Sequence, residues 1–461
     1  MSTADPKADP NILFILMDNL GYGEVGCYGG GLLRGAPTPN IDTLARDGTK
    51  LLNFNVEPQC TPSRSCVMTG RHSIRSGTHS VPLTGGDYGL VQWEQTIAKL
   101  LSAKGYATGH FGKWHLGNVP GRFPTDQGFD EWYGIPDTSD ETVWPSQPEF
   151  DPSVAHVAHI YEGTKGGSSR EVKPYDLTTR PEIDMEITEK TIEFMDRCAE
   201  ANKPFYAYVP YTLVHFPTLP SEQFKGVTGN GDWADCLAQI DHNVGRLLET
   251  VDRLGLRDDT IVVFTSDNGA DTSTLHKRGS AGPWAGTMFT PMEGFNRVPF
   301  IVRWPGRVSA DRESDAIVHE VDTFTTLLRF VGADVPDDRP IDGVDQSGLF
   351  LGETDSSARE GFPIYFGEKL YAAKWRNYKL HFVWQVNTFD AVSTLGVPRI
   401  FNLITNPQEN PDENIFTTHL WVLKAASKML GEFQASLTEH PPIPSGTPDP
   451  YVPPEPAVAP T

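Results

Sequence analysis

The sequence is poor in cysteine, in positive charge and in long apolar runs. Its five cysteines include no CxxC pair, which argues against a disulfide framework or a zinc knuckle in a chain of 461 residues. The 38 basic residues against 60 acidic ones give a formal net charge of −22, so the basic surface that nucleic acids or anionic membranes require is missing. No apolar run approaches the ~20 residues that span a bilayer, and residues 1–7 lack the layout of a signal peptide. These absences predict a reduced, cytoplasmic protein that binds neither nucleic acid nor membrane.

What the sequence does contain is a series of short β-rich runs, each followed by a loop and then by helix-like sequence. That alternation predicts a large, mostly parallel sheet flanked by helices. The run from Ile12 to Met17 is apolar throughout, as expected of a strand that is buried on both faces. Further strands are predicted at 106–111, 205–209, 260–265 and 300–302, and helices at 96–104, 183–202 and 233–254.

The pattern of apolar and polar residues changes near residue 362. Short, closely spaced runs at 364–366, 371–375 and 378–382 predict a small antiparallel sheet, closed by a helix at 420–437. The end of the chain is rich in proline, has little to bury and is predicted to be extended or disordered. We therefore predict a large α/β domain at 1–361, a small antiparallel-sheet and helix domain at 362–440, and a Pro-rich tail at 441–461.

Polar side chains of an unusual kind follow four of the predicted strands. Parallel strands bring their carboxyl ends to one edge of a sheet, and ligands of open α/β sheets bind at that edge. Two of the strands end in an Asp-Asn pair, which offers carboxylate and amide oxygens. These are hard ligands that suit Ca²⁺ or Mg²⁺. A lone Asp-Asn pair is usually a turn or a helix cap, but four such strand ends together predict a metal-dependent hydrolase of an anionic ester. The residues are Asp18 and Asn19, Asp267 and Asn268, Lys113 and His115, and His215.

Residues 60–71 read Cys-Thr-Pro-Ser-Arg-Ser-Cys-Val-Met-Thr-Gly-Arg. This segment resembles the signature of the type I sulfatases, Cys-x-Pro-Ser-Arg-x-x-x-x-Thr-Gly-Arg, at every fixed position. The resemblance continues from the first strand through Arg297-Val298-Pro299, and the C-terminal texture also fits. It implies an alkaline-phosphatase-like α/β fold and an arylsulfatase-like sulfuric ester hydrolase that cleaves sulfate monoesters of small molecules.

The resemblance also implies a maturation step and a metal. In the family a formylglycine-generating enzyme oxidises the motif cysteine, here Cys60, to formylglycine. The same comparison implies one divalent ion, Ca²⁺ in preference to Mg²⁺ or Mn²⁺. Its ligands would be residue 60 together with Asp18, Asn19, Asp267 and Asn268.

A formylglycine suits ester hydrolysis for a chemical reason. Its hydrate carries two hydroxyls on one carbon, so that one attacks sulfur and the other later expels sulfate, whereas a thiol adduct would have no easy exit. By resemblance, Lys113, His115 and His215 occupy substrate-binding and proton-transfer positions, and Arg64 holds the modified side chain. Asp267 is then the candidate base for the attacking hydroxyl. His215 is the candidate acid for the leaving oxygen, and His115 the base for the second hydroxyl. Lys113 and Arg64 would offset the charge on sulfate.

Two positions depart from the family pattern. The family usually has a second Asp where this chain has Asn19, and many members have a Lys at the place of Met288. One negative and one positive charge are therefore absent, so the formal charge of the site is unchanged. We hypothesise that the two losses compensate each other. Without that lysine near the leaving group, we predict better activity on aryl than on alkyl sulfates. The candidates for a substitute cation are His276, Lys277 and Arg278.

Two other functions remain open at this point. A phosphonate or phosphate ester hydrolase that uses the same formylglycine would share the motif. An unmodified, non-catalytic anion-binding protein would keep Cys60 as a thiol. A homo-oligomer also remains open.

Overall fold

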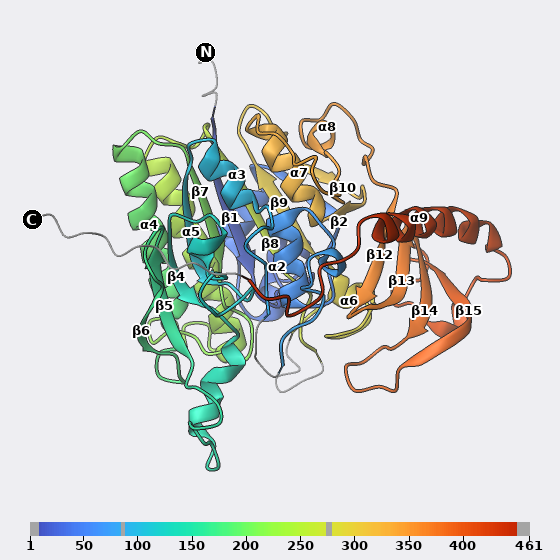
Figure 1. The fold of residues 1–461 in the computed structure, drawn as a ribbon, viewed down its shortest axis with the longest axis horizontal. Coiled ribbons are helices and arrows are strands. Elements are labelled where there is room, and N and C mark those ends of the chain that lie inside the picture. Colours follow the sequence, from blue (N-terminus) through green and yellow to red (C-terminus); the bar gives the residue numbers. More distant parts are fainter. Residues whose placement is uncertain (1–8, 84–87, 273–278, 450–461) are drawn as a thin grey trace, which may run out of the picture.

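The computed structural model describes residues 9–83, 88–272 and 279–449 (Figure 1). This part of the chain forms an 11-stranded sheet and a separate four-stranded antiparallel sheet. In the large sheet the strand order is β10-β2-β9-β8-β1-β7-β3-β4-β5-β6, and β11 pairs with β2. Its strands are β1 (Asn11–Met17), β2 (Thr49–Asn55), β3 (Ala107–Lys113), β4 (Glu131–Ile135), β5 (His159–Thr164), β6 (Arg170–Pro174), β7 (Phe205–Pro210), β8 (Thr260–Ser266), β9 (Arg297–Arg303), β10 (Arg312–Ser314) and β11 (Val318–His319).

Helices cover both faces of the large sheet, because its central strands are apolar on both sides. One face is covered by α1 (Pro39–Arg46), α4 (Ile183–Glu200) and α5 (Asp232–Arg253). The other is covered by α2 (Cys60–Thr69), α3 (Ile97–Ala103) and α7 (Val321–Phe330). The remaining short helices are α6 (Glu293–Asn296), α8 (Ser347–Phe350) and the 3₁₀ turns η1 (Gly26–Tyr28), η2 (Gly31–Arg34), η3 (Ser73–Arg75), η4 (Pro124–Gln127), η5 (Ser139–Ser146) and η6 (Pro411–Glu413).

The four strands that carry the predicted polar ends are parallel neighbours. β1 pairs in parallel with β7 and β8, and β3 pairs in parallel with β7. Their carboxyl ends therefore lie at one edge, and the predicted mostly parallel α/β sheet is confirmed. β9 was predicted as a strand, and it runs antiparallel to both β8 and β2.

The C-terminal part is a small antiparallel sheet with one long helix packed on it. The order is β12-β13-β14-β15, and α9 packs on the sheet through Val422 and Ala426. Beyond α9 the chain returns to the large sheet's domain, where the backbone N–H of Ile443 donates to the carbonyl of Arg75 (2.9 Å; Figure 1). The elements are β12 (Gly361–Phe366), β13 (Lys369–Trp375), β14 (Tyr378–Trp384), β15 (Ser393–Asn402) and α9 (Leu420–Glu439).

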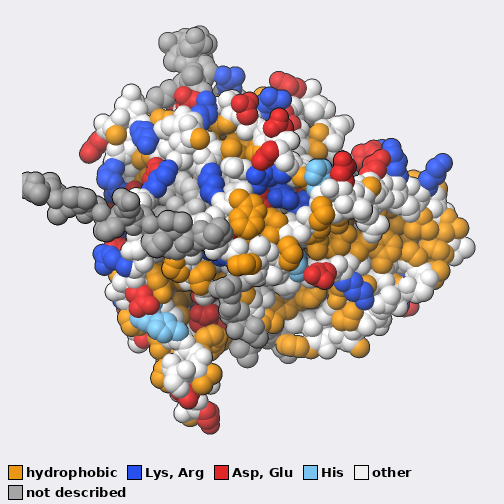
Figure 2. All heavy atoms as spheres, viewed as in Figure 1, with side chains coloured by type: hydrophobic (Ala, Val, Ile, Leu, Met, Phe, Trp, Pro, Cys, Tyr) orange, Lys and Arg blue, Asp and Glu red, His pale blue; other side chains and the backbone are white. Residues whose placement is uncertain are grey.

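The surface of this small sheet differs from the rest of the molecule. Figure 2 shows apolar side chains gathered over α9 and the neighbouring strands, whereas charges of both signs are scattered over the large domain. At the start of α9, Leu420 and Trp421 are about half exposed. None of the helices in the described ranges combines the length and the apolar character that a bilayer-spanning segment needs. All five cysteines are free thiols.

Buried charges hold the small sheet against the large one. Lys374 and Lys379 point from the small sheet to Glu293 in α6, with Nζ–Oε distances of 2.6 and 3.0 Å. All three side chains are completely buried. Lys374 also donates to the side-chain oxygens of Asn53 and Asn55 (2.8 and 2.7 Å), both of which lie in strand β2 of the large sheet. Such a network is sensitive to the loss of one partner, because the others stay buried without it.

Replacing Lys374 by methionine should therefore destabilise the protein. We expect the free energy of unfolding to fall by about 3–5 kcal/mol, the range for removal of one partner of a buried ion pair. The matched control is Lys428→Met in α9, because the Lys428 side chain is 79% exposed and its partner Glu432 is 3.7 Å away. That control should change stability by less than about 0.5 kcal/mol. Urea unfolding measures both, and equal effects of the two changes would contradict this account.

Candidate active site

The predicted polar residues come together at the carboxyl edge of the large sheet. Asp18 and Asn19 follow β1 directly, Lys113 is the last residue of β3, and Asp267 follows β8. Asn19 and His115 have left-handed backbones with φ of 61° and 58°. Non-glycine residues adopt this region uncommonly, and such residues gather at functional sites. All the predicted site side chains are buried, with at most 7% of the residue exposed.

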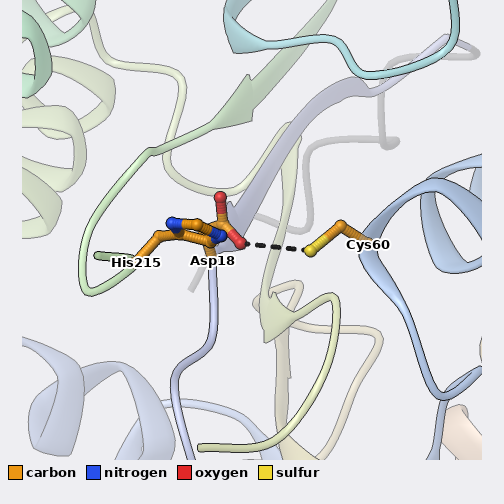
Figure 3. A group of neighbouring side chains, drawn as sticks. All are labelled: Asp18, Cys60 and His215. Carbon is orange, nitrogen blue, oxygen red and sulfur yellow. Dashed lines mark hydrogen bonds between the residues drawn. The ribbon is translucent and has the colours of Figure 1, made fainter. Parts of the chain in front are cut away.

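Cys60 is the first residue of α2, so its side chain lies at the positive end of a helix dipole. Its Sγ is 3.2 Å from Oδ1 of Asn268 and 3.6 Å from Oδ1 of Asp18. Figure 3 shows Cys60 pointing from α2 toward Asp18, with His215 on the other side of that carboxylate. Potential ligand atoms of these three residues all lie within 4.8 Å of one another. Burial, and then the charge of Asp267, raise the pKa of the Cys60 thiol well above its ordinary value, so the unmodified side chain is a weak nucleophile.

Two cations are paired with the two buried carboxylates of the site. Nζ of Lys113 is 2.8 Å from Oδ2 of Asp18. Arg64 lies one helical turn after Cys60, and its Nε and Nη2 donate to Oδ2 of Asp267 at 3.0 and 2.7 Å. Burial raises the pKa of Asp18, but attraction by Lys113, His215 and Arg64 outweighs this effect and holds it below its usual range. Burial and repulsion by Asp18 raise the pKa of Asp267. The site therefore keeps carboxylates and cations together in a buried environment.

The oxygen donors of this site fit a hard divalent cation. Asp18, Asp267 and Asn268 are completely buried, and Asn19 is 2% exposed. The backbone N–H of Asn19 donates to Oδ1 of Asp267 (3.3 Å), and Nδ2 of Asn268 donates to Oδ1 of Asn19, so the two Asp-Asn pairs are in direct contact. Carboxylate and amide oxygens in one buried site are the donor type that Ca²⁺ and Mg²⁺ prefer.

The two histidines differ in their surroundings. Nδ1 of His215 is 2.7 Å from the carbonyl of Phe216. Because a carbonyl only accepts hydrogen bonds, Nδ1 carries the proton and Nε2 is left to act on a substrate. His115 is fixed through its own carbonyl, which accepts from Oγ1 of Thr61 in α2 (3.0 Å). Burial, and then the charge of Lys113, hold the pKa of His115 well below its ordinary value, so it is a neutral proton acceptor.

The loop of His215 is supported by residues that the sequence analysis did not identify. Arg180 is buried and donates to the carbonyls of Thr212 and His215 (3.2 and 3.1 Å). Asp184 in α4 accepts the backbone N–H groups of Thr212 and Leu213, both at 2.9 Å. Neither residue belongs to a recognisable motif, and their link to the site exists only in the folded chain.

A second set of unpredicted residues lies in the loop after β4. Oγ1 of Thr138 is 3.4 Å from Nε2 of His215, and Oδ1 of Asp140 is 3.7 Å from its Nδ1. Both residues sit in a polar stretch without periodicity, so no sequence signal marks them. His276, Lys277 and Arg278, the candidates for a substitute cation, lie outside the described residues.

Comparisons with known proteins agree with this geometry. The sequence model of the family described as Sulfatase matches residues 10–333. The chain is 31% identical to the N-acetylgalactosamine-6-sulfatase of Canis lupus familiaris, over 95% of this chain and 88% of that one. It is 32% identical to Arylsulfatase A of Homo sapiens, over 87% of this chain and 82% of that one.

Solved structures are also similar to this chain. The PsFucS1 sulfatase from Pseudoalteromonas sp. is similar with a TM-score of 0.88 and 30% identity, over 95% of this chain and 92% of that one. The Phosphonate Monoester Hydrolase of Agrobacterium radiobacter is similar with a TM-score of 0.60 and 17% identity, over 94% and 96% of the two chains. This last likeness concerns the fold alone.

Proposed function

The chain belongs to the sulfatase family and hydrolyses sulfate esters, and we propose that it does so with a formylglycine made from Cys60 and one divalent metal ion. The observation that carries this proposal is the contact of the Cys60 side chain, within the 60–71 motif, with oxygens of Asp18 and Asn268. Maturation then requires a formylglycine-generating enzyme. The cytoplasmic location and the homo-oligomer stay predictions.

The metal would be held by residue 60 together with Asp18, Asn19, Asp267 and Asn268. We propose Ca²⁺ because the four Asp and Asn side chains all offer oxygen donors. Such an ion supplies Lewis-acid polarisation of a sulfate oxygen and lowers the pKa of a bound hydroxyl. The hydrated aldehyde supplies two hydroxyls on one carbon, one for attack on sulfur and one for the later release of sulfate.

The remaining steps belong to side chains of this chain. Lys113 and Arg64 are completely buried and stabilise negative charge on the sulfate group. Asp267 accepts the proton of the attacking hydroxyl. The doubly protonated ring of His215 donates the Nε2 proton to the leaving oxygen while Nδ1 keeps its bond to Phe216, and His115 accepts a proton when sulfate is released. Supporting these assignments are the neutral state of His115 and the Nδ1–Phe216 bond that leaves Nε2 of His215 available.

Intact-mass measurement tests the proposal most directly. Protein made together with a formylglycine-generating enzyme should be lighter than protein made without it by about 18 Da, or nearly equal in mass when the aldehyde is hydrated. An aldehyde-specific hydrazide probe separates the hydrate from the unmodified thiol. Metal analysis of the active protein should find one divalent ion per chain. A fully active protein with an intact Cys60 thiol would overturn the proposal.

The departures at Asn19 and Met288 lead to a separate prediction. We expect Asn19→Asp and Met288→Lys to change kcat/KM singly, and the double variant to deviate from additivity by about 1 kcal/mol or more, because the two charges act on one site. We also expect Met288→Lys to favour alkyl over aryl sulfates by supplying a cation near the leaving oxygen. If each single change leaves kcat/KM unaltered and the two effects are strictly additive in the double variant, the two charge losses do not compensate each other. An original protein that cleaves alkyl and activated aryl sulfates equally well would contradict the leaving-group preference.

A further inference from the structure

Three carboxyl groups border the active site in the loop after β4 and the start of η5. They are Asp137, Asp140 and Glu141, and we call them the acidic rim. The Asp140 side chain is 52% exposed, and Asp137 and Glu141 are partly exposed. Thr138 belongs to the same loop, and its Oγ1 is 3.4 Å from Nε2 of His215. The loop that carries the acidic rim therefore reaches both ring nitrogens of His215, with Thr138 at Nε2 and Asp140 at Nδ1.

Asp137 of the acidic rim is anchored by hydrogen bonds, and Asp140 contacts His215. Asp137 accepts hydrogen bonds from the hydroxyl of Tyr88 and from Nδ2 of Asn118, the latter at 3.0 Å. Oδ1 of Asp140 is 3.7 Å from Nδ1 of His215. Anchored side chains of this kind can select a ligand, because little conformational freedom is lost on binding.

The charge of the acidic rim is poorly balanced. Burial, and then repulsion by Asp137 and Asp140, raise the pKa of Glu141 to about 8. Among the described residues, the cation that bears on both Asp137 and Glu141 is Lys113. Lys113 is already paired with Asp18 at 2.8 Å. At neutral pH Glu141 is therefore largely protonated, so the rim presents acceptor oxygens and a hydroxyl donor, and the negative potential beside His215 comes chiefly from Asp140.

The leaving group of the substrate must lie beside His215. The groups that would hold the sulfate are nearly closed off, since Cys60 is 7% exposed and His215 is 5% exposed. The alcohol half must extend from Nε2 of His215 toward solvent, and the half-exposed Asp140 lies on the same histidine. The hydroxyls of an alcohol with several hydroxyl groups could donate to the rim carboxyls. A second sulfate or carboxylate there would face like charge from Asp140.

We propose that the acidic rim is a subsite for the leaving group, a proposal that rests on the proposed function. The subsite accepts uncharged, hydroxyl-rich alcohols such as neutral sugars. It rejects alcohols that carry a second anionic group. The chain would thus act on singly sulfated neutral saccharides. This specificity comes from the rim and is independent of how the sulfate itself is held.

The test compares two substrates that differ in one charge, a methyl hexoside monosulfate and the same hexoside with a second sulfate. In the mature enzyme we expect kcat/KM for the cleavage of the shared ester to favour the monosulfate by about 30-fold or more, mainly through KM. The double variant Asp140→Asn/Glu141→Gln should reduce this preference to about 5-fold or less. The control Glu149→Gln, an exposed acid further along the same segment, should leave the preference unchanged.

A second measurement needs no variant. Raising the ionic strength from about 0.1 to about 1 M shortens the screening length from roughly 10 to 3 Å, so the preference of the original enzyme should fall several-fold. A preference near one, or one that neither salt nor the double variant changes, would overturn the subsite while leaving sulfatase activity established. Failure to cleave both hexosides and an activated aryl sulfate would instead overturn the proposed function.

Discussion

Replacing Cys60 by alanine should reduce kcat/KM for an activated aryl sulfate by at least about 10⁴-fold. Alanine cannot be oxidised to formylglycine, so the change removes both hydroxyls that the reaction requires. The surrounding pairs, Lys113 with Asp18 and Arg64 with Asp267, do not depend on the Cys60 side chain and should survive. Stopped assays on protein matured with the formylglycine-generating enzyme measure the loss. Circular dichroism checks that the variant is folded.

Cys66 supplies the matched control for this variant. It lies in the same helix, is equally buried, and its Sγ is 3.6 Å from Oε1 of Glu57, away from the Cys60 contacts. Cys66→Ala should keep kcat/KM within about 10-fold, because it removes a small packing residue and no reacting group. If Cys60→Ala hydrolysed the aryl sulfate as fast as the original chain, residue 60 would not be the nucleophile.

Replacing His215 by glutamine should slow the enzyme in a manner that depends on the leaving group. A general acid contributes about 10²–10⁴-fold when the leaving oxygen is basic. We therefore expect a loss of that size for an alkyl sulfate, and a loss below about 10-fold for a strongly activated aryl sulfate, whose phenolate leaves without a proton. The measurement is kcat/KM for a series of phenyl sulfates. The dependence of log kcat/KM on the pKa of the phenol should be steeper in the variant.

The control for His215 is His156→Gln. The His156 side chain is 76% exposed, and its neighbours are His159 and Glu171. Its replacement should leave both the rate and the leaving-group dependence unchanged. A uniform loss across the series in His215→Gln would indicate a role in binding or positioning in place of proton donation.

The strands predicted from sequence are those whose burial is uniform. β1 and β8 are buried at every position, and continuous apolar runs at 12–17 and 260–265 indicated them. β6 is an edge strand with four of five residues exposed, and four of the ten residues of β15 are exposed, so neither carries an apolar pattern that could be recognised. β2 mixes polar and apolar residues because Asn53 and Asn55 serve the buried Lys374.

The candidate site likewise contains residues that the sequence marks and residues that only the folded structure reveals. Residues at strand ends or in the 60–71 segment, such as Asp18, Asp267 and Arg64, were predicted because local sequence marks them. The pairing of Arg64 with Asp267 joins positions 203 residues apart and required the folded chain. Arg180, Thr138 and Asp140 carry no local signal at all, because their role depends on contact with the loop of His215.

By itself, the amino-acid sequence determined the alternation of strands and helices, the Cys60 motif and the Asp-Asn pairs, because each depends on residues close together along the chain. Only the tertiary structure decided which charges pair, which histidine nitrogen is available and which carboxyl lies beside His215. Those properties come from burial and from contacts between distant segments. The interaction energy of charges rises steeply when water is removed, so it depends on folding.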